Sequence, residues 1–285
     1  MNPLVADLLH VLELKQLGED SFEGEGRDPG HHRLYGGHVL AQALAAAYRT
    51  VDDRHVHSLH AYFLRSGDPT DHIRYEVDRA RDGISFASRR VSAIQGEAEL
   101  LHLSASFQVA EHGINRQASM PEVAEPEACP DMTTALEEFR RVAPDRPRPF
   151  LLRQRPFEFR PAGLPDPRAE APQVPKLKIW FRAWDRIPDD ERLHRCVLAY
   201  ASDYYLLSTA ALDVRLSVDP SRLQLASIDH AMWFHRSVRV DEWLLYVLES
   251  PSASGSRGFA HGNIFNRGGD LVASTAQEGV VRNRR

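Results

Sequence analysis

Apolar and polar residues recur along the chain in two similar runs, and each run predicts one helix followed by several strands. In the first run, residues 39–48 are rich in Leu and Ala and follow Gly36-Gly37, which predicts a helix that begins at a tight backbone turn. Alternating or β-branched segments separated by Gly-Asp, Asp-Gly or short polar breaks then predict antiparallel strands. These strands are expected at about 57–65, 73–77, 86–94 and 100–109.

The second run predicts the same set of elements in the C-terminal half of the chain. A helix is expected at about 203–212, and Gly268-Gly269-Asp270 is typical of a turn that closes the last hairpin. One long apolar helix beside an antiparallel sheet is buried when the sheet curls around it, and two such units can join their sheets edge to edge. The expected class is therefore α+β, with a cleft between each helix and the neighbouring unit. The strands of this run are expected near 223–236, 242–249, 257–266 and 271–278.

Three short matches indicate that one structural unit is duplicated. His60-Ala61 recurs as His230-Ala231, Ser88-Arg89 as Ser256-Arg257, and Ser106-Phe107-Gln108 as Thr275-Ala276-Gln277. The matches lie 170, 168 and 169 residues apart (60 to 230, 88 to 256, 108 to 277) and keep the same order. A nearly constant spacing between ordered matches is typical of an internal repeat.

Prolines separate the two copies. Twelve of the 18 prolines lie between Pro121 and Pro175, beside the acidic run 122–127, so regular structure there is expected to be short and interrupted. We therefore predict an N-terminal unit at 1–113, a proline-rich connection at 114–150 and a C-terminal unit at 151–285.

Composition and charge argue against several classes of partner. The 285 residues, 42% of them hydrophobic, can bury a large core, and a net charge of −5 with scattered basic residues offers no positive field for nucleic acid or an anionic membrane. No apolar stretch approaches the ~20 residues needed to cross a bilayer. Cys129 and Cys196 lie far apart without partners at metal-ligand spacing, which argues against a disulfide framework and a zinc site. We expect a cytoplasmic protein.

Asp203 has the most apolar surroundings of any acidic residue in the chain, within the segment LAYASDYYLL at 198–207. One interpretation is capping, in which Ser202 or Asp203 accepts hydrogen bonds from backbone N–H groups at a helix start. The other is a general base, because a carboxylate partly shielded from water is a better proton acceptor. The segment alone favours capping.

Ser227 and Gln277 are two further polar candidates on predicted strands. Ser227 precedes Asp229 and His230, but residues so close on one strand do not converge as the members of a catalytic triad do. The chain has no Gly-x-Ser-x-Gly elbow, so an acyl-serine is not expected. The amide of Gln277 both donates and accepts hydrogen bonds, which suits a residue that holds water, although an ordinary strand-end residue needs no such role.

Histidines and arginines offer weaker candidates. His55, His57 and His60 resemble a ligand cluster, but His60 is out of phase with the other two on a strand and no acidic ligand completes the set. No metal site is therefore expected. His38, near the predicted helix start, is either a solvated loop residue or a substrate contact. Arg257 either solvates a sheet edge or attracts substrate phosphates.

Several ordered segments together resemble the type II acyl-CoA thioesterases, the double-hotdog family that includes bacterial thioesterase II and peroxisomal enzymes. The resemblance spans nearly the whole chain. The segments that carry it are YGGHV (35–39), HSLHAYFLR (57–65), RDGISF (81–86), YASD (200–203), IDHAMWFHR (228–236) and ASTAQEG (273–279).

The resemblance implies a double hotdog, two tandem units that each wrap a curved antiparallel sheet around a long helix, with an active site in the second copy. Asp203 matches the family's catalytic aspartate, Ser227 its Ser/Thr position and Gln277 its glutamine. In the first copy Gly37 stands where the second has Asp203, while Gln108 matches Gln277. One complete polar set per chain is therefore implied.

The implied reaction is hydrolysis of an acyl-CoA thioester by a positioned water. Asp203 would act as general base, Ser227 and Gln277 would orient the water or the base, and amides at a helix start would stabilise the oxyanion. Coenzyme A is part of the substrate, and neither a metal nor another cofactor is implied. Gly37, His38 and Arg257 are the expected substrate contacts.

Two other functions stay open from the sequence. One is a hotdog acyl-CoA hydratase or dehydratase, against which the Asp, Ser and Gln set argues. The other is a non-catalytic acyl-CoA-binding module, against which the intact Asp203 argues. The family also implies a homo-oligomer, a dimer or tetramer of double hotdogs.

Overall fold

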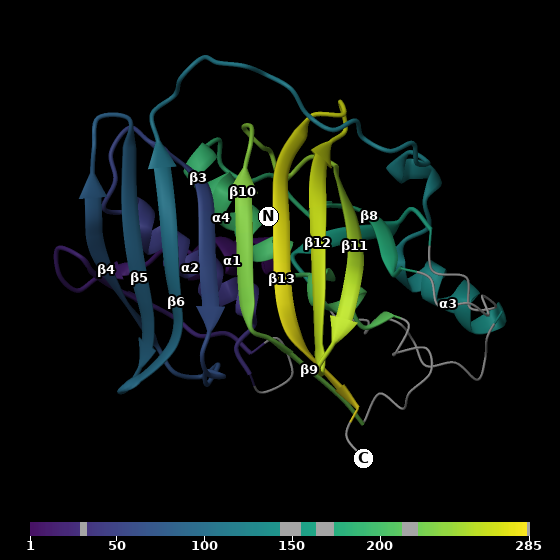
Figure 1. Ribbon diagram of the computed structural model, residues 1–285, viewed down its shortest axis with the longest axis horizontal. Coiled ribbons are helices and arrows are strands. Elements are labelled where there is room, and N and C mark those ends of the chain that lie inside the picture. The colour runs from purple at the N-terminus through teal and green to yellow at the C-terminus, as the bar shows by residue number, and fades with distance from the viewer. Residues whose placement is uncertain (29–32, 143–154, 164–173, 213–221, 284–285) are drawn as a thin grey trace.

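One antiparallel sheet runs through the chain, and the main helices lie together on one of its faces (Figure 1). The computed structural model describes residues 1–28, 33–142, 155–163, 174–212 and 222–283. Among these residues the helices are α1 Pro3–Val11, α2 Gly36–Tyr48, the 3₁₀ helix η1 Pro126–Ala128, α3 Met132–Val142, α4 Glu191–Ser202 and α5 Leu206–Thr209. The strands are β1 Lys15–Gln16, β2 Ser21–Gly24, β3 His55–Phe63, β4 Ile73–Asp82, β5 Phe86–Gln95, β6 Ala98–Gln108, β7 Phe157–Pro161, β8 Lys176–Ala183, β9 Leu223–Ser227, β10 Asp229–Phe234, β11 Leu244–Ser254, β12 Arg257–Asn266 and β13 Leu271–Asn283.

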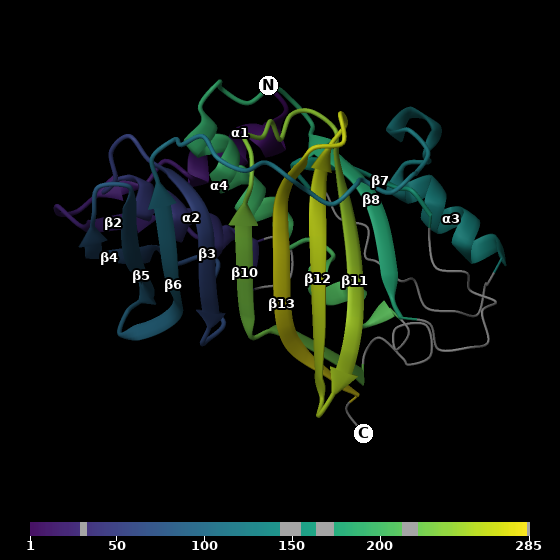
Figure 2. The same ribbon diagram turned by 45° about the horizontal axis from the view of Figure 1, so that its top comes forward.

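The order of the strands is the same in both halves of the sheet. From the outside inward, the N-terminal half runs β2-β4-β5-β6-β3 and the C-terminal half runs β8-β11-β12-β13-β10. The halves meet where β3 pairs with β10, and each half places one long helix, α2 or α4, on the same face (Figure 2). The predicted α+β double hotdog is confirmed. Below, the first unit means β2, α2 and β3–β6 with the described residues that join them, and the second unit means β8, α4 and β10–β13 with the described residues that join them.

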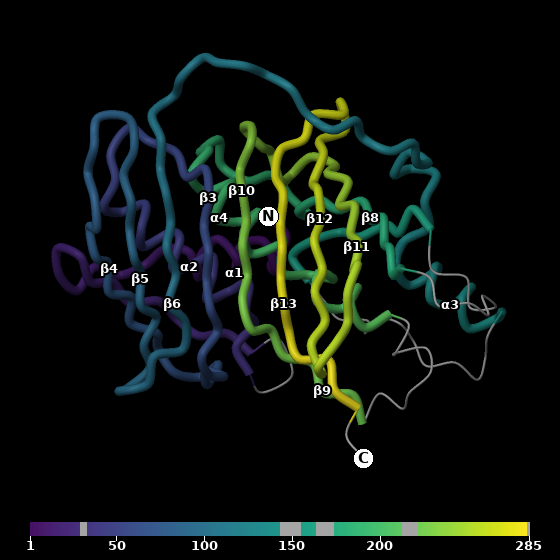
Figure 3. The backbone as a smooth tube through the Cα atoms, viewed as in Figure 1, coloured from purple at the N-terminus to yellow at the C-terminus, as the bar shows by residue number. Residues whose placement is uncertain are grey.

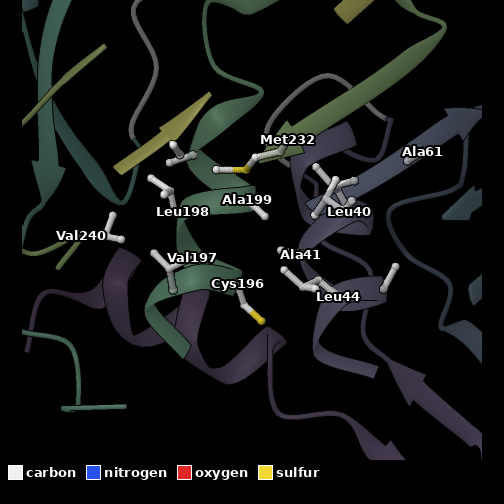
Figure 4. Close-up of a cluster of buried hydrophobic side chains, with 14 of the residues drawn as sticks. Leu40, Ala41, Leu44, Ala61, Cys196, Val197, Leu198, Ala199, Met232 and Val240 are labelled. Carbon is white, nitrogen blue, oxygen red and sulfur yellow. The ribbon is translucent and has the colours of Figure 1, made fainter. Parts of the chain in front are cut away.

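The core lies between the sheet and the two long helices. Eleven of the 13 residues of α2 are buried, because the sheet covers one side of this helix and α4 covers another. Figure 4 shows Leu40 and Leu44 of α2 with Cys196 and Ala199 of α4 in this cluster, where small side chains let the helices approach. Leu40 and Leu44 are fully buried, and each such side chain contributes about 1.5–3 kcal/mol to folding.

The predicted helix at 203–212 is wrong, because the long helix of the second unit ends where that prediction begins. Helix α4 spans Glu191–Ser202, is capped by the Asp190 carboxylate bonded to Arg192 N (2.8 Å), and is followed by Asp203. The pattern concealed this helix because its first turns are charged. Tyr205 has a left-handed backbone (φ 65°), which separates α4 from the short α5.

The repeat is real, but the matches that predicted it are out of register. Tyr75 of β4 and Tyr246 of β11, 171 residues apart (75 to 246), are the equivalent pair: both are buried, and each hydroxyl bonds the helix of its own unit. A spacing of 170 instead pairs exposed His60 with buried His230. A shift of one residue turns a strand side chain to the opposite face of the sheet.

The other two matches also pair residues that lie in unlike surroundings. Arg89 is buried where Arg257 is exposed, and Gln108 bonds Glu111 near the surface (3.1 Å) whereas Gln277 is fully buried. Gln108 is therefore not the counterpart of Gln277, contrary to the prediction.

The connection between the units arches from β6 across to the far side of the second unit (Figure 3). Its described part contains η1 and the 11-residue helix α3, which the proline pattern does not predict. The predicted unit boundaries stay predictions, and residues 143–154, which hold the boundary at 150/151, lie outside the described residues. In the described parts of the chain, no helix is long and apolar enough to cross a membrane.

Candidate active site

Asp203 lies where the end of α4 faces the start of α2. The helix break at Asp203–Tyr205 turns its carboxylate toward the first unit, where the amide N–H of Gly37 donates to Oδ2 at 2.9 Å. The side chain is only 7% exposed. The N-terminus of a helix carries partial positive charge, so the start of α2 stabilises the negative carboxylate. The two units thus form this site together.

Gln277 and Ser227 complete the polar group around Asp203. Inward-facing residues alternate along β13, so Gln277 points from the sheet toward the helices and is fully buried. Its Nε2 donates to Asp203 Oδ1 at 2.8 Å and to Ser227 Oγ at 3.1 Å. Ser227 ends β9 opposite Gly279, two residues beyond Gln277. The three residues that the sequence predicted to act together are therefore in contact.

His230 is a fourth member of this group that the sequence reasoning did not place in the site. It is fully buried on β10, with Nε2 2.9 Å from Ser202 Oγ and Nδ1 3.4 Å from Gln277 Nε2. Burial lowers the pKa of His230, and the Asp203 carboxylate, 4.0 Å from Nδ1, opposes this effect. The inward phase of β10 is the signal that could have located it.

Aromatic side chains form one wall of the site. Tyr35 of the first unit stacks on Tyr204 (ring centroids 4.8 Å apart) and donates its hydroxyl to the Tyr200 carbonyl at 3.0 Å. Burial and the nearby Asp203 raise the pKa of Tyr35 well above its usual value, so this hydroxyl stays protonated. The wall gives Asp203 an apolar environment that excludes bulk water.

A cleft of about 850 Å³ lies near this wall. Phe157 and Phe159 line it and also contact Tyr204. Tyr205, two residues beyond Asp203, lines it too, and its hydroxyl accepts a hydrogen bond from Arg155 at 2.5 Å. The cleft therefore brings aromatic side chains together with the guanidinium of Arg155.

The other predicted site residues lie apart from this group or play another part in it. His38 is buried on α2, and its Nε2 lies 2.9 Å from the Glu25 carbonyl, so it supports the fold rather than the Asp203 cluster. Arg257 is half exposed and pairs with Glu278 at 2.9 Å. Gly37 is not the counterpart of Asp203, because Gly37 begins α2 whereas Asp203 follows the end of α4. The misplaced helix caused this wrong match.

None of the described residues form a group of three or more His, Cys, Asp or Glu side chains arranged to hold a metal ion. The groups that meet at Asp203 are a carboxylate, an amide, a hydroxyl and a helix N-terminus. This set suits activation of water beside an electrophile.

Comparisons with known proteins point the same way. The model of the acyl-CoA thioesterase family matches residues 166–280, and that of the acyl-CoA thioesterase N-terminal domain matches residues 25–108. Acyl-CoA thioesterase 2 of Haemophilus influenzae is 37% identical, with 99% of each chain covered. Human acyl-coenzyme A thioesterase 8 is 40% identical over 95% of this chain and 88% of its own length.

A solved structure agrees in both sequence and shape. Acyl-CoA thioesterase II from Mycobacterium marinum is 40% identical, covers 97% of this chain and 98% of its own, and superposes with a TM-score of 0.80. The chain therefore belongs to the type II acyl-CoA thioesterases, enzymes with a double-hotdog fold.

Proposed function

We propose that the chain hydrolyses acyl-CoA thioesters with a water molecule that Asp203 activates and that Ser227 and Gln277 help to orient. The observation that carries the proposal is the convergence of these three side chains on the N-terminus of α2, where Gly37 N–H meets Asp203. A base, orienting groups and a positive helix end are the parts that attack on a thioester carbonyl requires.

The reaction proceeds in two steps. Asp203 takes one proton as the water oxygen bonds to the thioester carbon, and the carbonyl oxygen becomes an oxyanion that the N-terminus of α2 stabilises. When the oxyanion collapses, the C–S bond breaks, and the coenzyme A thiolate receives the proton from Asp203. The products are a fatty acid and coenzyme A, and no cofactor is consumed.

Direct attack by water fits the surroundings of Ser227 better than an acyl-serine does. Its Oγ accepts a hydrogen bond from Gln277, which is an amide and not a base. Histidine is the usual base for such a serine, and His230 contacts Gln277 and Ser202 instead. Trapping an acyl group on Ser227 during turnover would overturn this mechanism.

The test is the release of free thiol from acyl-CoAs of increasing chain length by the wild type and by Asp203→Asn. The asparagine keeps the shape of the side chain but cannot take a proton, so we expect a loss of about 10³-fold or more in kcat. Binding of thioester without thiol release by the wild type would favour the non-catalytic module. A fully active Asp203→Asn variant would exclude Asp203 as the base.

We also propose that the enzyme is a homo-oligomer of double hotdogs, a dimer or a tetramer. An outer sheet face that carries large side chains such as Tyr62 (51% exposed) and Trp233 (36%) supports association. Sedimentation equilibrium gives the number of chains, and a monomer at micromolar concentration would contradict the proposal.

A further inference from the structure

His230 is fully buried beside the reacting groups, yet the proposed reaction assigns it no role. It joins the end of α4 to β13, since its two ring nitrogens face Ser202 on one side and Gln277 on the other. A buried imidazole in this position determines which atoms its neighbours can use.

Ser202 decides which ring nitrogen carries the hydrogen. The Oγ of Ser202 donates its single hydrogen to the Ala199 carbonyl at 2.8 Å, so toward His230 it can only accept. Nε2 of His230 must therefore be the N–H donor. In the neutral ring Nδ1 is then an acceptor and nothing else, and it faces Gln277.

Acceptors surround the amide nitrogen of Gln277. They are Asp203 Oδ1 at 2.8 Å, Ser227 Oγ at 3.1 Å and His230 Nδ1 at 3.4 Å. The other amide atom, Oε1, is buried and has no hydrogen-bond partner in the part of the chain that the structure describes. A buried oxygen without a donor costs on the order of 1–3 kcal/mol, so this position calls for a donor from outside the protein.

Asp203 alone cannot hold the amide in this orientation through the reaction. As a carboxylate, Asp203 only accepts hydrogen bonds, but once it has taken a proton it can also donate one. The amide of Gln277 could then turn by 180°, with Oε1 toward Asp203, and we call this the reversed amide. Nδ1 of His230 does not change, because its proton stays on Nε2. It is the acceptor that excludes the reversed amide at every stage.

We propose that His230 is a positioning residue: Nδ1 holds Nε2 of Gln277, which leaves Oε1 of Gln277 to accept the second hydrogen of the attacking water. The inference rests on the proposed function and adds two assignments to it, the amide oxygen as the water acceptor and the imidazole as the group that keeps it available. His230 touches no reacting atom and acts through Gln277.

Two substitutions separate this role from a structural one. His230→Asn can place its carbonyl oxygen where Nδ1 lies, but it does not reach Ser202. His230→Gln can donate to Ser202, but it has no acceptor beside Gln277. Each variant keeps one of the two hydrogen bonds and loses the other.

The proposal predicts opposite orders for activity and stability. We expect kcat of His230→Asn to stay within about 5-fold of the wild type and kcat of His230→Gln to fall about 30- to 100-fold, with KM of both changed less than about 3-fold. Because Ser202 anchors the ring to α4, His230→Gln should have the higher melting temperature. If activity and stability fall in the same order, or both variants are equally active, His230 is only structural and the proposal is overturned.

A measurement on the wild type needs no variant to fold. The ¹⁵N chemical shifts of the His230 ring distinguish a hydrogen on Nε2 from one on Nδ1, and a hydrogen on Nδ1 would overturn the proposal. Asp203→Asn, assayed beside the two His230 variants, separates the proposed function from the proposed role of His230. If it is fully active, the proposed function fails; if it is inactive while the His230 pair behaves alike, only the role of His230 fails.

Discussion

The backbone N–H of Gly37 in the first unit donates to Oδ2 of Asp203 in the second unit, 2.9 Å away. Gly37 comes near the start of α2 and Asp203 comes just after α4, so the bond joins the beginning of one helix to the end of the other. The first unit therefore takes part in the chemistry without supplying a catalytic side chain.

Gly37→Ala tests this contact. An added Cβ would collide with the Tyr200 carbonyl oxygen and lie 2.6 Å from Tyr35 Cε1, so the backbone at the contact between Gly37 and Asp203 must shift. We expect kcat/KM for acyl-CoA to fall about 100-fold or more, because a shift of 1 Å at a catalytic contact has effects of this size. Gly113→Ala is the matched control, since its Cβ meets nothing within 4 Å. Equal activity of the two variants would contradict the role of Gly37.

Ser227→Ala should slow turnover without abolishing it. The substitution removes one hydrogen bond to Gln277 (3.1 Å), and one oriented hydrogen bond is worth ~1 to 4 kcal/mol in the barrier. Ser227→Thr keeps the hydroxyl and should retain most of kcat. Ser104→Ala, on the exposed side of β6, is the control for loss of a strand hydroxyl. Complete inactivity of Ser227→Ala would indicate a nucleophilic serine.

Arg257→Ala separates a substrate contact from a surface ion pair. Its pairing with Glu278 is exposed, and such pairs add only ~0–1 kcal/mol to stability. If Arg257 binds the nucleotide phosphates, KM should rise about 5- to 10-fold for acyl-CoA and stay constant for acyl-pantetheine, which lacks the nucleotide. Arg267→Ala, at another exposed ion pair, is the control. Unchanged KM for both substrates would remove Arg257 from the binding site.

The unfolding free energy should depend on pH through His38. Burial lowers the pKa of His38 from 6.5 to about 4, so between these values the unfolded chain binds a proton that the folded chain does not. Stability is therefore retained above pH 6.5 and lost as pH falls toward 4, by at most ~1.4 kcal/mol per pH unit for this group. Urea unfolding at pH 7 and pH 5 measures the slope, which His38→Gln should reduce. An equal slope in the variant would assign the effect to other buried histidines such as His194 and His230, whose pKa values burial also lowers.

The sequence predicts the strands better than the helices, for a physical reason. Alternation places β12 at 257–266, which agrees with its bounds Arg257–Asn266. Helix α4 escapes prediction because its outward side carries Glu191 and Arg192, while the apolar residues after Asp203 imitate a helix. The left-handed backbone of Tyr205 interrupts the helix where the apolar pattern continues.

Some site residues could be predicted from the sequence, and one could be found only from the packed structure. Asp203 and Gln277 lie in the family segments and Ser227 directly precedes one, and the three side chains form one hydrogen-bonded group. His230 could not be singled out, because its role depends on the phase of β10 relative to α4, which a single strand does not encode.

The pairing of β3 with β10 has a consequence for how such a chain can be divided. His60 pairs with Ala231 and Ala61 with His230, so the seam brings together two antiparallel strands from equivalent positions of the repeat. A chain cut in the connection would leave two exposed strand edges, at which each half could pair with a second copy of itself instead of its complement. Only a pair made of one N-terminal and one C-terminal half places Gly37 next to Asp203. Because the two units are covalently joined, every C-terminal unit with Asp203 has one N-terminal unit with Gly37 beside it. Two separate polypeptides could not guarantee this one-to-one ratio.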